Sequence, residues 1–122
     1  MTRAFVLGNG ISRRGLPLND ISKYGDIYGC NALFRDYIPK VLVATDKPIA
    51  LHIEETGYPL TNKFYTRKPT EGKGGNVIPK PYYGFSSGPV AVALAANDQY
   101  RRIYMIGFDL GPNQDQKFNN LY

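Results

Sequence analysis

Short apolar segments alternate with helix-like segments along the chain, and this alternation constrains the fold more than any other feature. A parallel pair of strands needs a long crossover, usually a helix, so strands separated by helical patterns indicate a parallel α/β sheet. The expected strands are Ala4–Leu7, Ile27–Cys30, Val41–Ala44, Lys63–Thr66 and Ile103–Ile106. We predict an α/β fold, a single-domain Rossmann-like three-layer sandwich with a mostly parallel sheet of about five strands. Lys63–Thr66 is expected at an edge, and Ile103–Ile106 is expected to be the last buried strand.

Helices and helical turns are predicted between the strands from apolar spacing, capping residues and glycine or proline stops. They cover Pro17–Tyr24, Ala32–Tyr37, a helix capped by Thr45 or Asp46 that runs through Glu55, and Pro89 to about Asn97. Residues 67–84 contain four glycines, three prolines and four basic residues, which predicts a long irregular loop. Residues 111–122 are expected to form a polar tail, and residues 1–122 are expected to form one domain.

Composition limits the functional classes. The net charge of +5 favours anionic partners, but the basic residues form no long run of the kind found in nucleic-acid-binding tails. The ten tyrosines are interpreted either as boundary residues or as a base-stacking surface. The single cysteine, Cys30, permits no internal disulfide, and no apolar run reaches the length of a membrane span. We expect a cytoplasmic protein without a membrane or nucleic-acid partner.

Polar residues follow most of the expected strands, at the carboxyl ends where parallel sheets bind their ligands. Glycines let a backbone approach a phosphate closely, and the first turn of a helix offers free N–H groups to an anion. The candidate ligand-binding residues are Gly8, Asn9, Gly10, Ser12 and Arg13 after the first strand, Asn31 after the second, Asp46 after the third, Gly107 and Asp109 after the last, and Ser86, Ser87 and Gly88 at the start of the last helix.

Each of these motifs also has a structural interpretation. The GNGIS loop is neither a Walker A sequence nor a complete GxGxxG, so it is either a tight turn or a ligand loop. One serine of the Ser86–Ser87 pair suffices as a helix N-cap, and Asn31 can bond to local backbone groups. Asp46 and Asp109 bind a metal or ribose hydroxyls in one interpretation, and cap helices or turns in the other. His52 lies within a predicted helix, where a surface position is the alternative to a catalytic base.

The order of four motifs is more specific than any one of them: GNGIS, then YGCN, then SSG before an Ala-rich helix, then IYMIGFDL. With this order, from Phe5 to Leu110, the chain resembles the bacterial sialyltransferases of glycosyltransferase family 42, and it is similar to the related hydroxymethylpterin diphosphokinase-like proteins. The resemblance implies that Asn9 and Gly10 line the phosphate or sugar region, and that Asn31 bonds to the nucleotide or donor sugar. It implies that the nucleotide is held by Ser86, Ser87 and Gly88. It also implies that Gly107 and Asp109 shape the pocket floor.

Several features of the sialyltransferases are missing from this chain. No histidine follows His52, so the family's histidine base downstream of the last motif has no counterpart. Gly84 stands where the family carries an arginine, and Leu110 and Gly111 stand where it carries a tyrosine. The family's lid-forming segment also exceeds what 122 residues accommodate. We therefore do not expect sialyl transfer.

Two functions are carried forward from the sequence. The first is a binding protein, of a kind suited to a phage, that captures a nucleotide or nucleotide-derived ligand without turning it over and requires no cofactor. The second is a minimal nucleotide-dependent transferase for a nucleotide sugar or a pyrophosphoryl group, with Asp46 or Asp109 as base or as ligand of a divalent cation. In that enzyme, phosphate charge would be neutralised by Arg13, Arg14, Lys73 and Lys80. Apolar sheet edges also predict a homo-oligomer, and nucleic-acid binding is the least favoured alternative.

Overall fold

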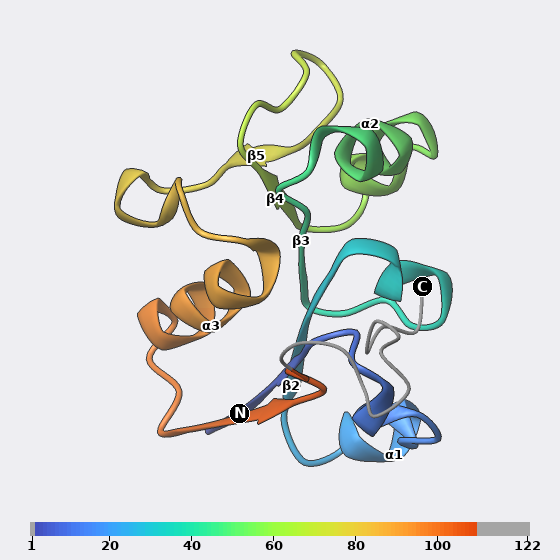
Figure 1. The fold of residues 1–122 in the computed structure, drawn as a ribbon, viewed down its shortest axis with the longest axis vertical. Coiled ribbons are helices and arrows are strands. Elements are labelled where there is room, and N and C mark those ends of the chain that lie inside the picture. Colours follow the sequence, from blue (N-terminus) through green and yellow to red (C-terminus); the bar gives the residue numbers. More distant parts are fainter. Residues whose placement is uncertain (1, 110–122) are drawn as a thin grey trace.

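A parallel β-sheet with helices on both faces forms the centre of the computed structural model, which describes residues 2–109 (Figure 1). Within residues 2–109 the sheet has six strands, and every neighbouring pair is parallel. The predicted α/β class is confirmed, with one strand more than expected. The strands are β1 (Arg3–Leu7), β2 (Asp26–Cys30), β3 (Val41–Val43), β4 (Phe64–Thr66), β5 (Asn76–Val77) and β6 (Arg102–Ile106).

The strand order, β5-β4-β3-β2-β1-β6, changes direction once. From β1 to β5 the chain adds each strand on the same side of the previous one. It then crosses the sheet through α3 (Ser87–Asn97) and places β6 on the other side of β1. The point of reversal lies between β1 and β6, and open α/β sheets commonly bind ligands at such a switch point.

Helices cover the two faces of the sheet differently. On one face α3 contacts β1, β2, β3 and β6, and it buries Val90 and Leu94 in the core beneath it. On the other face α1 (Leu18–Ile21), α2 (Lys47–Glu55) and the 3-10 helix η2 (Asn31–Arg35) surround a second core that contains Leu42, Ile53 and Phe64. Figure 1 shows α3 on one side of the sheet and α1 and α2 on the other. The other helices of residues 2–109 are the 3-10 helices η1 (Ile11–Arg13), η3 (Tyr58–Leu60) and η4 (Lys80–Tyr82).

The apolar composition of β3 follows from this three-layer arrangement. Successive side chains of a strand point to opposite faces, so Val41 and Val43 pack in the core under α3 while Leu42 packs in the core under α2. All three residues are buried. A strand covered on both faces needs apolar residues at every position, and this is why the continuous apolar run predicted it correctly.

Four segments differ from the predictions. β4 pairs with both β3 and β5, so Lys63–Thr66 is not at the edge. The edge strand is β5, which lies with η4 inside residues 67–84, a region predicted to be wholly irregular. β6 is an edge strand with exposed side chains rather than a buried strand, because an apolar run does not reveal whether a second strand pairs beside it. The first helix covers only Leu18–Ile21, and the predicted tail, 111–122, lies outside the described residues.

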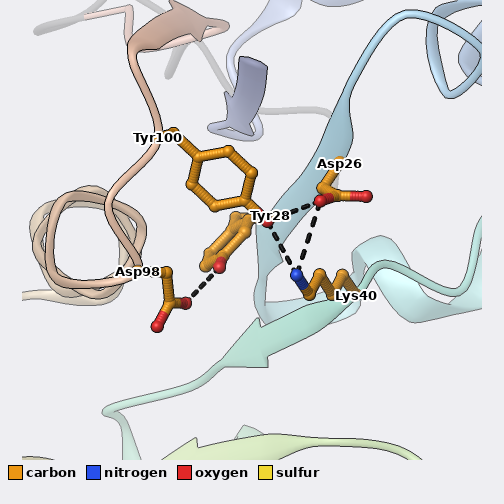
Figure 2. A network of polar contacts seen from close by, with 5 residues as sticks. All are labelled: Asp26, Tyr28, Lys40, Asp98 and Tyr100. Atoms are coloured by element: carbon orange, nitrogen blue, oxygen red, sulfur yellow. Dashed lines mark hydrogen bonds and ion pairs between the residues drawn. The ribbon is translucent and has the colours of Figure 1, made fainter. Parts of the chain in front are cut away.

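A polar network at the amino edge of the sheet joins the end of α3 to β2 and to the start of β3 (Figure 2). Tyr28 donates its hydroxyl to Asp98, while Tyr100 donates to Asp26 Oδ2 at 2.6 Å and accepts from Lys40 Nζ at 2.8 Å. Burial alone would raise the pKa of Asp26, but the hydrogen bond from Tyr100 and the Lys40 ammonium outweigh it and lower that pKa. The network lies opposite the predicted ligand residues, and it fixes the connection from α3 to β6.

Candidate functional site

The two loops at the switch point contact each other directly through their backbones. Gly8 N donates to Ile106 O, and Gly10 N donates to Gly107 O, both at 2.8 Å. A Cβ atom on either Gly8 or Gly10 would lie 2.5 Å from Gly107 O, a distance that no real side chain tolerates. The two glycines of the GNG motif therefore allow one loop to approach the other. Close approach to another backbone is a sufficient reason for glycine at both positions.

Asp109 links the same two loops through Ser12. Its Oδ2 accepts from Ser12 N at 2.8 Å, and its Oδ1 accepts from the Ser12 hydroxyl at 2.5 Å. These hydrogen bonds from the hydroxyl and the backbone of Ser12 lower the pKa of Asp109, because they stabilise the carboxylate over the neutral acid. In this geometry Asp109 is an ionised acceptor that holds the segment after β6 against the loop after β1.

Arg13 and Asn9 extend this cluster toward β2. Arg13 is 5% exposed, and its Nε donates to Gly8 O at 2.8 Å while its Nη2 donates to Asn9 Oδ1 at 3.0 Å. Asn9 Nδ2 in turn donates to Cys30 O at 3.0 Å. Burial raises the pKa of the Cys30 thiol to about 11, although Arg13 opposes this, so the thiol stays protonated and is not a nucleophile at neutral pH.

A second cluster lies where α3 begins. The Ser87 hydroxyl accepts from Thr45 N at 2.9 Å, lies 3.1 Å from Thr45 Oγ1, and donates to Asn31 Oδ1 at 3.2 Å. Ser86 occupies the N-cap position of α3 but its side chain makes no capping hydrogen bond. One of the two serines was expected to cap this helix, and Ser86 stands at the N-cap position. Ser87 instead attaches the first turn of α3 to the ends of β2 and β3.

A cleft of about 440 Å³ opens beside this second cluster, between α2 and the segment that follows β4. Three cationic side chains and three threonines contribute to its lining, together with two carboxylates and two apolar side chains of α2. The lining residues are Thr45, Asp46, Lys47, Ala50, Leu51, Glu54, Thr66, Arg67, Lys68 and Thr70. Its volume lies in the range of small-molecule binding sites, about 300–1,000 Å³.

Two hydrogen-bonded contacts shape the walls of the cleft. Glu54, which is 5% exposed, accepts from Thr70 N and from Thr70 Oγ1, each at 2.8 Å, and so holds the segment after β4 against α2. Arg67 donates from Nε to Tyr83 O at 2.8 Å and from Nη2 to Phe85 O at 2.9 Å. Thr45 and Arg67, which both line the cleft, therefore connect its wall to Ser87 and to the residues just before α3.

The predicted site residues thus fall into three groups. The cluster at the start of α3 contains Asn31 and Ser87, and Asp46 lines the cleft. The cluster at the switch point contains Gly8, Asn9, Gly10, Ser12, Arg13, Gly107 and Asp109. Gly88 approaches the switch point from α3, because a Cβ atom there would lie 2.6 Å from the Phe108 ring. His52 is exposed on α2. Across residues 2–109, no group of three His, Cys, Asp or Glu side chains is placed to hold a metal ion.

Several residues of the cleft were not among the predicted site residues. Glu54, Thr66, Arg67, Lys68 and Thr70 come from α2, β4 and the segment that follows. The signal in the sequence that could have identified them is the adjacent basic pair Arg67 and Lys68, at the start of a long glycine-rich segment. Glu54 gave no signal, because a single acidic residue within an amphipathic helix usually faces solvent.

The chain matches no protein-family model, no curated protein and no solved structure. No helix between residues 2 and 109 is both long and apolar enough to cross a bilayer.

Proposed function

We propose that the protein binds a phosphorylated small molecule, a nucleotide or a nucleotide-derived ligand, at the carboxyl edge of the sheet. The observation that carries the proposal is the cleft of about 440 Å³, in which Lys47, Arg67 and Lys68 lie among threonine hydroxyls. Ammonium and guanidinium groups bind phosphate oxygens through charge-assisted hydrogen bonds, and hydroxyls donate to the same oxygens. The net charge of +5 favours the approach of an anion.

The two carboxylates of the cleft have different roles in this proposal. Glu54 is buried and already accepts two hydrogen bonds from Thr70, so it shapes the wall. Asp46 is exposed and lines the cleft at the end of β3. A carboxylate at this position accepts hydrogen bonds from sugar hydroxyls and repels phosphate. Asp46 therefore favours a ligand with a ribose or another polyol beside its phosphate.

Binding without turnover is the form of the proposal that we favour. Asp109 is held in a structural contact with Ser12, and Cys30 is a buried, protonated thiol, so neither presents a free reactive group to the cleft. Asp46 is the remaining candidate for the transferase alternative. The capture of a signalling nucleotide would need only the cleft.

Calorimetric titration with nucleosides, nucleotides and nucleotide sugars tests the proposal. Phosphorylated ligands should bind and the parent nucleosides should not. Lys47→Gln and Lys68→Gln should each weaken binding about 5- to 10-fold, because each loses one charged hydrogen-bond donor. Lys23→Gln, which removes an exposed lysine that does not line the cleft, is the matched control and should leave the affinity unchanged.

The recovered ligand separates capture from transfer. A ligand that comes back chemically unchanged, with and without Mg²⁺, supports capture, whereas a Mg²⁺-dependent product that Asp46→Asn abolishes would establish the transferase. Equal binding by the wild type and both lysine variants would refute the proposed cleft.

A further inference from the structure

The outer edge of β6 is open among the described residues. Among the strands of residues 2–109, β6 pairs with β1 alone and stands at the end of the strand order. Arg102 N donates to Thr2 O and Ile106 O accepts from Gly8 N, so the backbone groups of residues 102, 104 and 106 point toward β1. Because backbone groups of a strand alternate in direction, the N–H and C=O groups of Ile103 and Met105 point away from the sheet. They form a row of donors and acceptors for another strand.

Apolar side chains lie on both faces of this edge. Tyr104 is 40% exposed and stacks on Phe5 of β1, with ring centroids 5.3 Å apart and an interplanar angle of 20°. Met105 is 57% exposed and, as the next residue, points to the opposite face. Proteins usually protect edge strands with charges, proline or a bulge, and residues 103–106 of this edge have none of these.

The opposite edge of the sheet offers no equivalent surface. β5 has only two residues, Asn76 and Val77. Two glycines, Gly72 and Gly74, precede it with φ of +80° and +89°, which no extended strand adopts. A pairing strand would therefore find a ladder of useful length at β6 and not at β5.

We propose that β6 is a self-association surface, at which two copies of the chain pair through antiparallel β6 strands and form one continuous sheet. The inference does not depend on the proposed ligand. A two-fold axis at Tyr104 overlaps residues 102–106 completely and sets Ile103 opposite the partner's Met105. Those two residues carry the outward backbone groups, so this register satisfies them reciprocally. It also sets the two Tyr104 side chains opposite each other on one face.

The charges at the two ends of β6 fit this antiparallel arrangement. The exposed Arg101 and Arg102 lie just before β6 and at its first position, and the ionised Asp109 follows its other end. An antiparallel pair places the arginines of one copy beside the Gly107–Asp109 segment of its partner. A parallel pair would instead bring four arginines together. Charge complementarity therefore selects the antiparallel dimer.

Sedimentation velocity over a concentration series tests the surface. A contact limited to one strand edge is small, so the dimer should dissociate on dilution. Met105→Lys should shift the protein to monomer at every concentration, because it places a charge in the contact on each copy. Leu60→Lys is the matched control, since Leu60 is 64% exposed on η3, and it should leave the dimer intact. Circular dichroism checks that both variants fold.

Cysteine cross-linking tests the register. Residues opposite each other at a non-hydrogen-bonded antiparallel position have Cα atoms about 4.5 Å apart, a separation that a disulfide spans. Tyr104→Cys should therefore form a covalent dimer on mild oxidation, and Leu60→Cys should not. A wild type that stays monomeric at its highest soluble concentration would overturn the proposal, as would a dimer that Met105→Lys leaves intact. A dimer that Met105→Lys disrupts but Tyr104→Cys does not cross-link would overturn the register.

Discussion

Gly107 combines two requirements at one position. Its φ is +80°, and a Cβ atom there would lie 2.7 Å from Gly8 O. Gly57 has the same φ but no atom within 4 Å of such a Cβ, so it carries the conformational requirement alone. We predict that Gly57→Ala lowers the free energy of unfolding by roughly 1 kcal/mol and that Gly107→Ala lowers it by about 3 kcal/mol, because a steric cost is added. Urea denaturation of both variants measures the difference, and equal losses would show that the loops separate without cost.

Two buried tyrosines should respond in opposite ways to the loss of their hydroxyls. The Tyr58 hydroxyl is buried without a hydrogen-bond partner among residues 2–109, and burial raises its pKa to about 12. Tyr58→Phe removes an unpaired polar atom and should raise the free energy of unfolding by about 1 kcal/mol. Tyr28→Phe should lower it by about 1 kcal/mol, because Tyr28 donates to Asp98. Thermal denaturation checks both signs. A loss of stability in Tyr58→Phe would mean that its hydroxyl has a partner.

At the scale of elements, one residue holds the segment after β4 against α2. Thr70 donates both its N–H and its hydroxyl to the buried Glu54 carboxylate. Thr70→Ala should cost about 1.5 kcal/mol and should speed amide hydrogen exchange in residues 67–75, since one of the two bonds to a buried charge is lost. Thr70→Ser keeps the hydroxyl and should stay within about 0.5 kcal/mol of the wild type. If the two variants lose equal stability, the hydroxyl contributes nothing to this contact.

The predictability of each element follows from how local its determinants are. Buried strands such as β3 were predicted because burial on both faces demands a continuous apolar run. β5 was missed because the strand has only two residues, Asn76 and Val77, which are both exposed and follow a glycine. The edge position of β6 was missed because it depends on the strand order, which no residue of β6 encodes by itself.

The same distinction applies to the candidate site. The positions after β1, β2, β3 and β6 were predicted to lie at one edge because parallel strands end there together, and the structure places them so. The pairing of Ser12 with Asp109, 97 residues apart, could not be predicted, because it requires β6 to lie beside β1. The glycines of the GNG loop were interpreted as a turn or as a ligand loop. Their close approach to Gly107 is a third reason for glycine that only the fold reveals.

For the whole molecule, the edge formed by the amino ends of the strands and the edge formed by their carboxyl ends have different roles. The amino edge holds the network of Asp26, Lys40 and Tyr100, which joins elements far apart in sequence and contributes no residue to the lining of the cleft beside α2. The carboxyl edge holds the cleft and the two loop clusters. Substitutions at the amino edge should therefore change stability and leave ligand affinity unchanged, while those at Lys47 and Lys68 should do the reverse.

The amino-edge network also predicts how stability depends on pH. The pKa of Asp26 is lower in the native state than in the unfolded chain, where it has the ordinary aspartate value of 3.8. Around and below pH 3.8 the unfolded chain therefore binds more protons than the native state. The free energy of unfolding falls as the pH drops through this range. The hydrogen bond with Tyr100, together with Asp26, raises the pKa of Lys40 above its ordinary 10.5, so stability falls again as the pH rises through that higher value.

Tyr100→Phe should flatten both limbs of this profile, because the Tyr100 hydroxyl bonds to Asp26 and to Lys40. Asp26→Asn should remove the contribution of this carboxylate to the acid limb. Tyr24→Phe changes a tyrosine that is 63% exposed, and it should leave both limbs as they are in the wild type. Urea denaturation from acidic to alkaline pH measures the free energy of unfolding for each variant. If Tyr100→Phe lowers stability by the same amount at every pH, the tyrosine contributes through packing alone, and the linkage between this network and protonation is wrong.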